Sequence, residues 1–179
     1  MANYLSILRG INVSGQKRVP MVELKAVYEQ LNFKNITTYI QSGNVTFDSA
    51  NAKDLSKKIE KKISEKFNFD VPVIIRTIDE LEHTIKSNPF RKDKKNDVER
   101  LYVTYLAETP TQENINKLNT YDYSPEQFFL LGKEVYLFCP LGYGNSKLSN
   151  NFFENKLKVI ATTRNWRTTN ELLKIMKAG

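Results

Sequence analysis

The order of apolar patterns in this chain of 179 residues repeats once, and this repetition constrains the fold most strongly. Apolar residues at every second position predict a strand, whereas spacings of three and four predict an amphipathic helix. Along the chain these patterns give strand–helix–strand–strand–helix–strand within residues 3–85, and the same order within 101–163. We therefore predict an α+β fold of two ferredoxin-like βαββαβ units packed together, with mainly antiparallel sheets and an extra C-terminal helix.

The boundaries of the elements follow from capping and turn residues. Pro20 suits the first position of a helix, and Thr77 with Glu80 forms a capping box. In the second half we expect helices capped by Thr109, Ser149 and Thr168. The expected strands cover 3–9, 35–41, 44–48, 71–76, 101–107, 127–131, 134–139 and 158–163.

The segment 88–99 (NPFRKDKKNDVE) separates the two halves. It is polar and charged and shows no periodicity, which is typical of a linker or a mobile loop. We therefore predict one unit over 1–90, a linker over 91–99, and a second unit over 100–179 that includes the closing helix.

The chain is basic, with a formal net charge of +7 that is unevenly distributed. The last forty residues, 140–179, hold seven basic residues against only Glu154 and Glu171. A basic surface of this kind favours phosphate-bearing partners, although a basic protein with no such partner would have the same composition.

Several classes of site are disfavoured by the residue types present. Cys139 is the only cysteine, which excludes an internal disulfide, and its strand context favours a small buried hydrophobe. His83 is the only histidine and lies among charged residues, as a solvated side chain would. No spacing of metal-ligating residues stands out, so we expect neither a metal nor a cofactor. The N-terminus resembles no signal peptide and no segment is long enough to span a membrane, so we expect a cytoplasmic protein.

A first polar cluster is expected at one end of the first sheet. In a βαββαβ unit the exit of the first strand and the turn between the second and third strands lie at the same end. The start of the first helix, with its partial positive charge, lies there too. The candidate ligand-binding residues of this cluster are Arg9, Asn12, Lys17, Arg18, Ser42 and Asn44. The alternative is that the glycines and polar residues here only shape turns, with Asn12 bonding to its own loop.

A second polar cluster is expected at one end of the second sheet. The loop 140–148 should meet the exit of the last strand there, and Lys147 should converge with Arg164 on one basic pocket. The candidate ligand-binding residues of this cluster are Ser146, Lys147, Arg164, Asn165 and Trp166. The Gly-x-Gly and Ser-Lys pairs of the loop match neither the P-loop spacing nor the dinucleotide-binding motif.

The sequence resembles a known bacterial family along its whole length. The segments LRGINV, KRVPM, TYIQSGNV, SNPF, GNSKL and ATTRNW occur in the order found in the family known as domain of unknown function 1697. The resemblance implies a two-part α/β fold with ferredoxin-like character, and it implies no established activity.

Three classes of function stay open. The first is a binding protein for a nucleotide, a nucleic acid or another phosphate-bearing ligand. The third strand, 44–48, lacks the aromatic signature of RNA-recognition domains, so base reading on the sheet face is disfavoured. The second is an enzyme of the phosphoryl-transfer or hydrolase type that uses Arg, Lys and Ser, with catalytic residues unknown. The third is a protein-interaction module with an aromatic patch of Tyr143, Phe152, Phe153 and Trp166. For the two phenylalanines, packing in the core between the units is the preferred interpretation, and for Trp166 both interpretations stay open.

Overall fold

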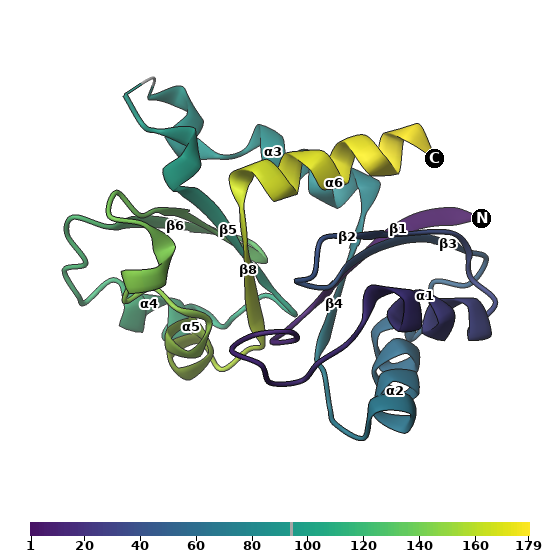
Figure 1. Ribbon diagram of the computed structural model, residues 1–179. Helices are drawn as coiled ribbons and strands as arrows, with labels where there is room; N and C mark the ends of the chain where they lie inside the picture. Colours follow the sequence, from purple (N-terminus) through teal and green to yellow (C-terminus); the bar gives the residue numbers. More distant parts are fainter. Residues whose placement is uncertain (94) are drawn as a thin grey trace. The chain divides into compact units, whose positions relative to one another are not determined.

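The computed structural model describes residues 1–93 and 95–179 (Figure 1). The chain divides into two compact units, one formed by Met1–Glu82 with Glu171–Gly179 and the other by His83–Asn170. The first unit is therefore made of two separate stretches of sequence. The domain limits expected at 1–90 and 100–179, with a linker at 91–99, stay a prediction.

The first unit contains a four-stranded antiparallel sheet in the order β2-β3-β1-β4, which is the ferredoxin-like order. Its elements are β1 (Ala2–Leu8), α1 (Met21–Gln30), β2 (Lys34–Tyr39), β3 (Asn44–Ser49), α2 (Leu55–Phe67), β4 (Val73–Thr77) and the start of α3 (Ile78–Lys86). Helices α1 and α2 cover the same face of this sheet (Figure 1).

The core of the first unit forms because the strands alternate. Tyr4 and Leu8 of β1 and Val45 and Phe47 of β3 point to the face covered by the two helices, where they pack with apolar residues of α1 and α2. Tyr28 of α1 is fully buried against this face, and its hydroxyl lies 2.6 Å from Ser6 Oγ.

The second unit has an antiparallel sheet in the order β6-β7-β5-β8, the same arrangement as in the first. Its elements are η1 (Pro89–Lys92), η2 (Val98–Arg100), β5 (Leu101–Leu106), α4 (Gln112–Leu118), β6 (Gln127–Leu131), β7 (Glu134–Phe138), η3 (Tyr143–Asn145), α5 (Asn150–Leu157), β8 (Ala161–Asn165) and the start of α6 (Trp166–Ala178). The predicted α+β fold of two ferredoxin-like units is therefore confirmed.

The two sheets share the register of their first and fourth strands. Leu5 is opposite Arg76 in the first sheet, and Val103 is opposite Arg164 in the second. In both sheets the fourth strand continues directly into a helix, which is visible for β8 and α6 in Figure 1. Each buried arginine also donates from Nη1 to the carbonyl of the preceding residue at 2.9 Å. This equivalence is visible in the structure although the two halves show no evident sequence identity.

Several expected element boundaries differ from the structure. The segment 88–99, expected to be aperiodic, overlaps two short 3₁₀ helices, η1 and η2, each capped by a preceding side chain, Asn88 or Asp97. Helix α4 is capped by Thr111 instead of Thr109. Strand β8 starts at Ala161 because Lys158 ends α5 in the left-handed conformation.

A further difference affects the candidate site. Helix α6 starts at Trp166 and not after Thr168, because the Asn165 side chain accepts a hydrogen bond from Thr168 N at 2.8 Å. Asparagine is among the best N-cap residues, and it competes successfully with the threonine three residues later. The capping box of Thr77 and Glu80 at the start of α3, in contrast, is confirmed by its two reciprocal hydrogen bonds.

Candidate ligand-binding cavity in the second unit

The first polar cluster does assemble at one end of the first sheet. Leu8 N donates to Gly43 O at 2.8 Å, so the exit of β1 contacts the turn between β2 and β3. Asn12 Nδ2 donates to Gln41 O at 2.8 Å, which connects the loop after β1 to the same turn. The expected meeting of these segments is therefore found.

Several candidate residues of this cluster hold the loops in place. Asn12 uses its side chain for three hydrogen bonds, because besides Gln41 it donates to Val19 O and accepts from Val19 N. Lys17 Nζ donates to Asp70 O at 2.6 Å. These contacts agree with the structural alternative for Asn12, that of bonding to its own loop.

The remaining candidates of this end are Arg9, Arg18, Ser42 and Asn44. Asn44 is fully buried and donates to Ser42 Oγ and to Tyr39 O, so this pair shapes the turn. Arg9 is half-buried and Arg18 is exposed. A ligand-binding role for the six residues of this cluster stays a prediction.

At the second sheet, the loop after β7 and the exit of β8 also meet at one end. Phe138 of β7 is opposite Leu101, and Asn165 of β8 is opposite Tyr102, so both strands end beside the start of β5. Tyr143 of the loop stacks on Tyr102, with ring centroids 5.1 Å apart, and its hydroxyl lies 3.2 Å from Thr163 Oγ1.

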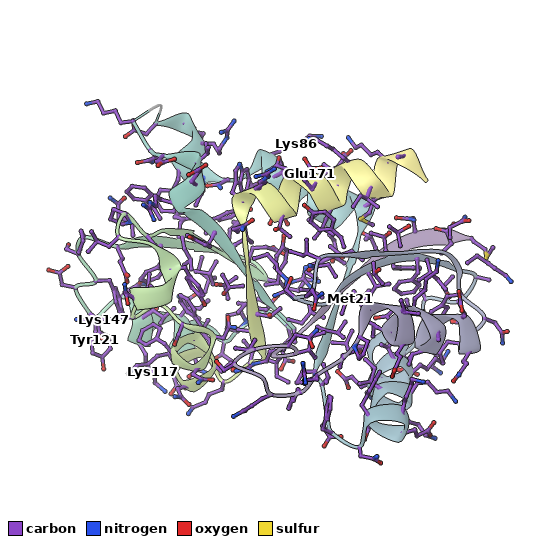
Figure 2. The ribbon with its side chains drawn as sticks, viewed as in Figure 1. Met21, Lys86, Lys117, Tyr121, Lys147 and Glu171 are labelled. Atoms are coloured by element: carbon purple, nitrogen blue, oxygen red, sulfur yellow. The ribbon has the colours of Figure 1, made fainter. Side chains whose placement is uncertain are left out.

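The expected convergence of Lys147 and Arg164 is not found. Successive residues of a strand point to opposite faces, and Thr163 contacts Asn150 of α5, so Arg164 points to the other face of the sheet. There its Nη1 donates to Thr162 Oγ1, and its burial lowers the pKa of the guanidinium to about 10. Lys147 is exposed on the side that carries α4 and α5 (Figure 2).

Other expected members of this end are also engaged in packing. Ser146 Oγ accepts from Leu148 N at 2.9 Å. Phe153 is fully buried and Phe152 is half-buried against it, so the two phenylalanines belong to the core, which was the preferred interpretation of them from the sequence. His83 is exposed, as expected.

The exit of β8 instead borders a cavity of about 370 Å³. Its walls come from the 3₁₀ helix η2, the start of β5 and the first turn of α6, and they are formed by Val98, Glu99, Tyr102, Asn165, Trp166 and Arg167. The volume lies in the range typical of small-molecule sites, about 300–1,000 Å³. Two of the candidate residues from the sequence, Asn165 and Trp166, therefore line a cavity.

The electrostatics of this cavity are set by the start of α6. A helix N-terminus has unsatisfied amide groups and a partial positive charge, which acidic residues in the first turn usually balance. Helix α3, at the equivalent place in the first unit, has Asp79 and Glu80 in its first turn. Helix α6 has no acidic residue there and has Arg167 instead. The start of α6 is consequently more positive than its counterpart.

Two charged side chains lie at the rim of this cavity, Glu99 and Arg167, and both are exposed. Neither forms an ion pair within residues 1–93 and 95–179. The two charges thus stay available to a ligand, one to an anionic group and one to hydrogen-bond donors. The sequence-based argument missed Arg167, Glu99, Tyr102 and Val98. For Arg167 a signal existed, since it directly follows Asn165 and Trp166.

A larger cavity, of about 690 Å³, lies in the first unit. It is lined partly by Ile175 and Ala178 at the end of α6 and by residues of both charges, including Lys34 and Glu29. The C-terminal end of a helix disfavours an anion, and the aromatic ring that lines this cavity, Phe33, is stacked in the core. We therefore regard the smaller cavity as the candidate site.

Two further searches concern metals and membranes. In the part of the chain that the structure describes, no cluster of three His, Cys, Asp or Glu residues could hold a metal ion. No helix among the described residues is both long and apolar enough to cross a bilayer.

Comparisons with known proteins agree with the fold. The family model described as "Protein of unknown function (DUF1697)" matches residues 1–136. The structure of the conserved bacterial protein SP0830 from Streptococcus pneumoniae is similar, with a TM-score of 0.74 and 21% sequence identity, and the match covers 98% of each chain. A search of the curated proteins gave no match.

Proposed function

The chain belongs to the DUF1697 family, and we propose that it binds a phosphate-bearing ligand in the cavity at the start of α6. The observation that carries this proposal is the position of Arg167, which forms no ion pair with the described residues and lies in a cavity at a helix N-terminus with no acidic residue in its first turn. A guanidinium and the amides of a helix start are both good donors to phosphate oxygens.

The equivalent helix start in the first unit supports the proposal by contrast. Both helix starts have one amide engaged by a capping side chain, Glu80 N by Thr77 in α3 and Thr168 N by Asn165 in α6, but α3 also has the two carboxylates of Asp79 and Glu80 in its first turn. An anion would be repelled there. The same place in the fold thus has opposite charge in the two units, which would follow if only the second unit served a ligand.

The enzymatic alternative lacks a specific observation. Two Ser–Lys pairs are conceivable from the residue types, Ser42 with Lys17 and Ser146 with Lys147, but Lys17 Nζ donates to a backbone carbonyl and Ser146 Oγ accepts from a backbone amide. The residues that line the cavity include no hydroxyl, thiol or imidazole nucleophile other than the Tyr102 phenol. Binding is therefore the function that the site supports best.

The proposal is tested by thermal unfolding in increasing concentrations of inorganic phosphate and of ribose 5-phosphate. A ligand that binds only the folded state raises the unfolding temperature by an amount that grows with its concentration. We expect this rise for the unmodified protein and its loss in Arg167→Gln. Lys117→Gln is the matched control, because it also removes one exposed cation of the second unit and should keep the full rise.

Two results would contradict the proposal. One is an unmodified protein whose unfolding temperature does not respond to either phosphate compound. The other is an equal response in Arg167→Gln and in the unmodified protein, which would place any anion site elsewhere.

A further inference from the structure

The residues that line the same cavity also indicate which chemical group the ligand has besides its phosphate. Resting on the proposed function, we infer that the ligand is a nucleoside monophosphate, with its base against Tyr102 and Val98, beside the buried Trp166, and its phosphate at Arg167. The cavity joins an apolar aromatic part to a charged rim, and such a site fits a ligand that has a flat ring at one end and one anionic group at the other.

The aromatic walls are held rigidly before any ligand arrives. Tyr143 stacks on the Tyr102 ring at 5.1 Å, and the hydroxyl of Tyr143 is in turn bonded to Thr163. Trp166 is only 6% exposed, so its indole is held in place but offers no open stacking face, and the ring on which a base can stack is that of Tyr102. Val98, which is exposed, adds an apolar surface from η2. Bases of every kind stack on such aromatic surfaces, so these walls favour a nucleobase without selecting one.

Glu99 favours a ligand that has hydrogen-bond donors as well as a phosphate. Its backbone is fixed by the cap of η2, where Glu99 N donates to Asp97 Oδ1 at 2.9 Å. A carboxylate accepts hydrogen bonds from ribose hydroxyls and from the amino groups of bases, both of which a nucleoside supplies. Inorganic phosphate at neutral pH gains little from Glu99, since the two are both negative.

The size and charge of the cavity favour a mononucleotide over a nucleic-acid strand. A volume of about 370 Å³ is near the lower end of the usual range for small-molecule sites. The rim has one carboxylate for its one guanidinium. A strand with a phosphate at every nucleotide needs a groove with excess positive charge, which these six residues do not provide.

Trp166 makes the test specific to the cavity, because it is the only tryptophan of the chain. A nucleobase bound in the cavity beside the indole changes its surroundings and quenches its fluorescence. Titrations of the full chain would use AMP, CMP, adenosine, ribose 5-phosphate, inorganic phosphate and a short single-stranded oligonucleotide. We expect at least one monophosphate to quench Trp166 and to bind at least about tenfold more tightly than ribose 5-phosphate.

Variants separate the two halves of the ligand. Glu99→Gln should weaken monophosphate binding while leaving the affinity for inorganic phosphate equal or higher, and Arg167→Gln should weaken both. Tyr102→Leu should weaken the monophosphate alone, and a circular dichroism spectrum equal to that of the unmodified protein confirms that each variant is folded. Lys117→Gln should change none of these affinities.

The outcomes distinguish this inference from the proposed function. If phosphate and ribose 5-phosphate bind through Arg167 but no monophosphate binds more tightly, this inference fails and the proposed function stands. If no phosphate compound binds, both fail. If the oligonucleotide binds and the monophosphates do not, the ligand is a nucleic acid and this inference is wrong.

Discussion

Gly43 occupies a position where the backbone and the surrounding atoms both exclude a side chain, and we predict that Gly43→Ala strongly destabilises the first unit. Its φ is +85°, and a Cβ there would lie 2.7 Å from Leu8 Cβ and 2.8 Å from Ile11 Cδ1. The left-handed backbone costs an alanine about 1–2 kcal/mol. Relieving the clash by moving the turn away from β1 adds about 1–3 kcal/mol.

The expected loss is therefore about 2–5 kcal/mol, a large part of the roughly 5–15 kcal/mol that stabilises a typical domain. The control is Gly132→Ala in the turn between β6 and β7. Its φ is +60° and a Cβ there meets nothing within 4 Å, so only the backbone contribution of about 1–2 kcal/mol applies.

Urea unfolding followed by circular dichroism gives both losses as free energies, provided that the slope with urea stays unchanged. The difference between the two variants isolates the clash with β1. Equal losses for Gly43→Ala and Gly132→Ala would show that the turn does not pack on the exit of β1. The first polar cluster would then lack its structural basis.

Three further predictions concern single side chains. Asn12→Ala removes three hydrogen bonds between the loop after β1 and its neighbours, so we expect a loss of about 2–4 kcal/mol in the free energy of unfolding. The amide of Val19 should also exchange faster with solvent, which NMR measures. Unchanged exchange at Val19 would refute this prediction. Asn165→Ala removes the cap of α6 and should lower the free energy of unfolding by about 0.5–2 kcal/mol. Asn165→Asp should keep the cap, but its added negative charge should weaken phosphate binding in the thermal assay. Equal phosphate responses of Asn165→Asp and the unmodified protein would count against the cavity as an anion site. Burial raises the pKa of the Cys139 thiol to about 11, so the thiolate is scarce in the folded state at pH 8. A thiol reagent should therefore modify Cys139 only after unfolding. Rapid modification of the folded protein would contradict the burial of Cys139.

The element order and the sheets could be predicted from the sequence because alternation and helical spacing are local signals. Ser149 and the pair Thr77 and Glu80 marked two helix starts correctly, and Pro20, expected at the first helical position, lies one residue before it. The start of α6 was misplaced because Asn165 and Thr168 are both acceptable caps, and only the direct passage from β8 into α6 decides between them.

The candidate site was predicted less well, for a reason that Arg164 illustrates. The topology gave the correct end of the sheet, but the face to which a side chain points depends on the register of β8, which the sequence-based strand limits misplaced. Arg167 was missed because the closing helix was expected to start after Thr168, which placed Arg167 in a loop instead of in the first turn of α6. Tyr102 and Glu99 come from segments more than sixty residues away in the sequence, and only the pairing of β5 with β8 brings them to Trp166.

The first unit is built from the beginning and the end of the chain, with Glu171–Gly179 joining Met1–Glu82. A protein is synthesised from its N-terminus, and domains made of one continuous stretch fold as soon as that stretch emerges from the ribosome. Here the second unit, His83–Asn170, is complete before the first unit can be. Residues 1–82 of the nascent chain must therefore wait for their partner segment until residues 171–179 have been synthesised.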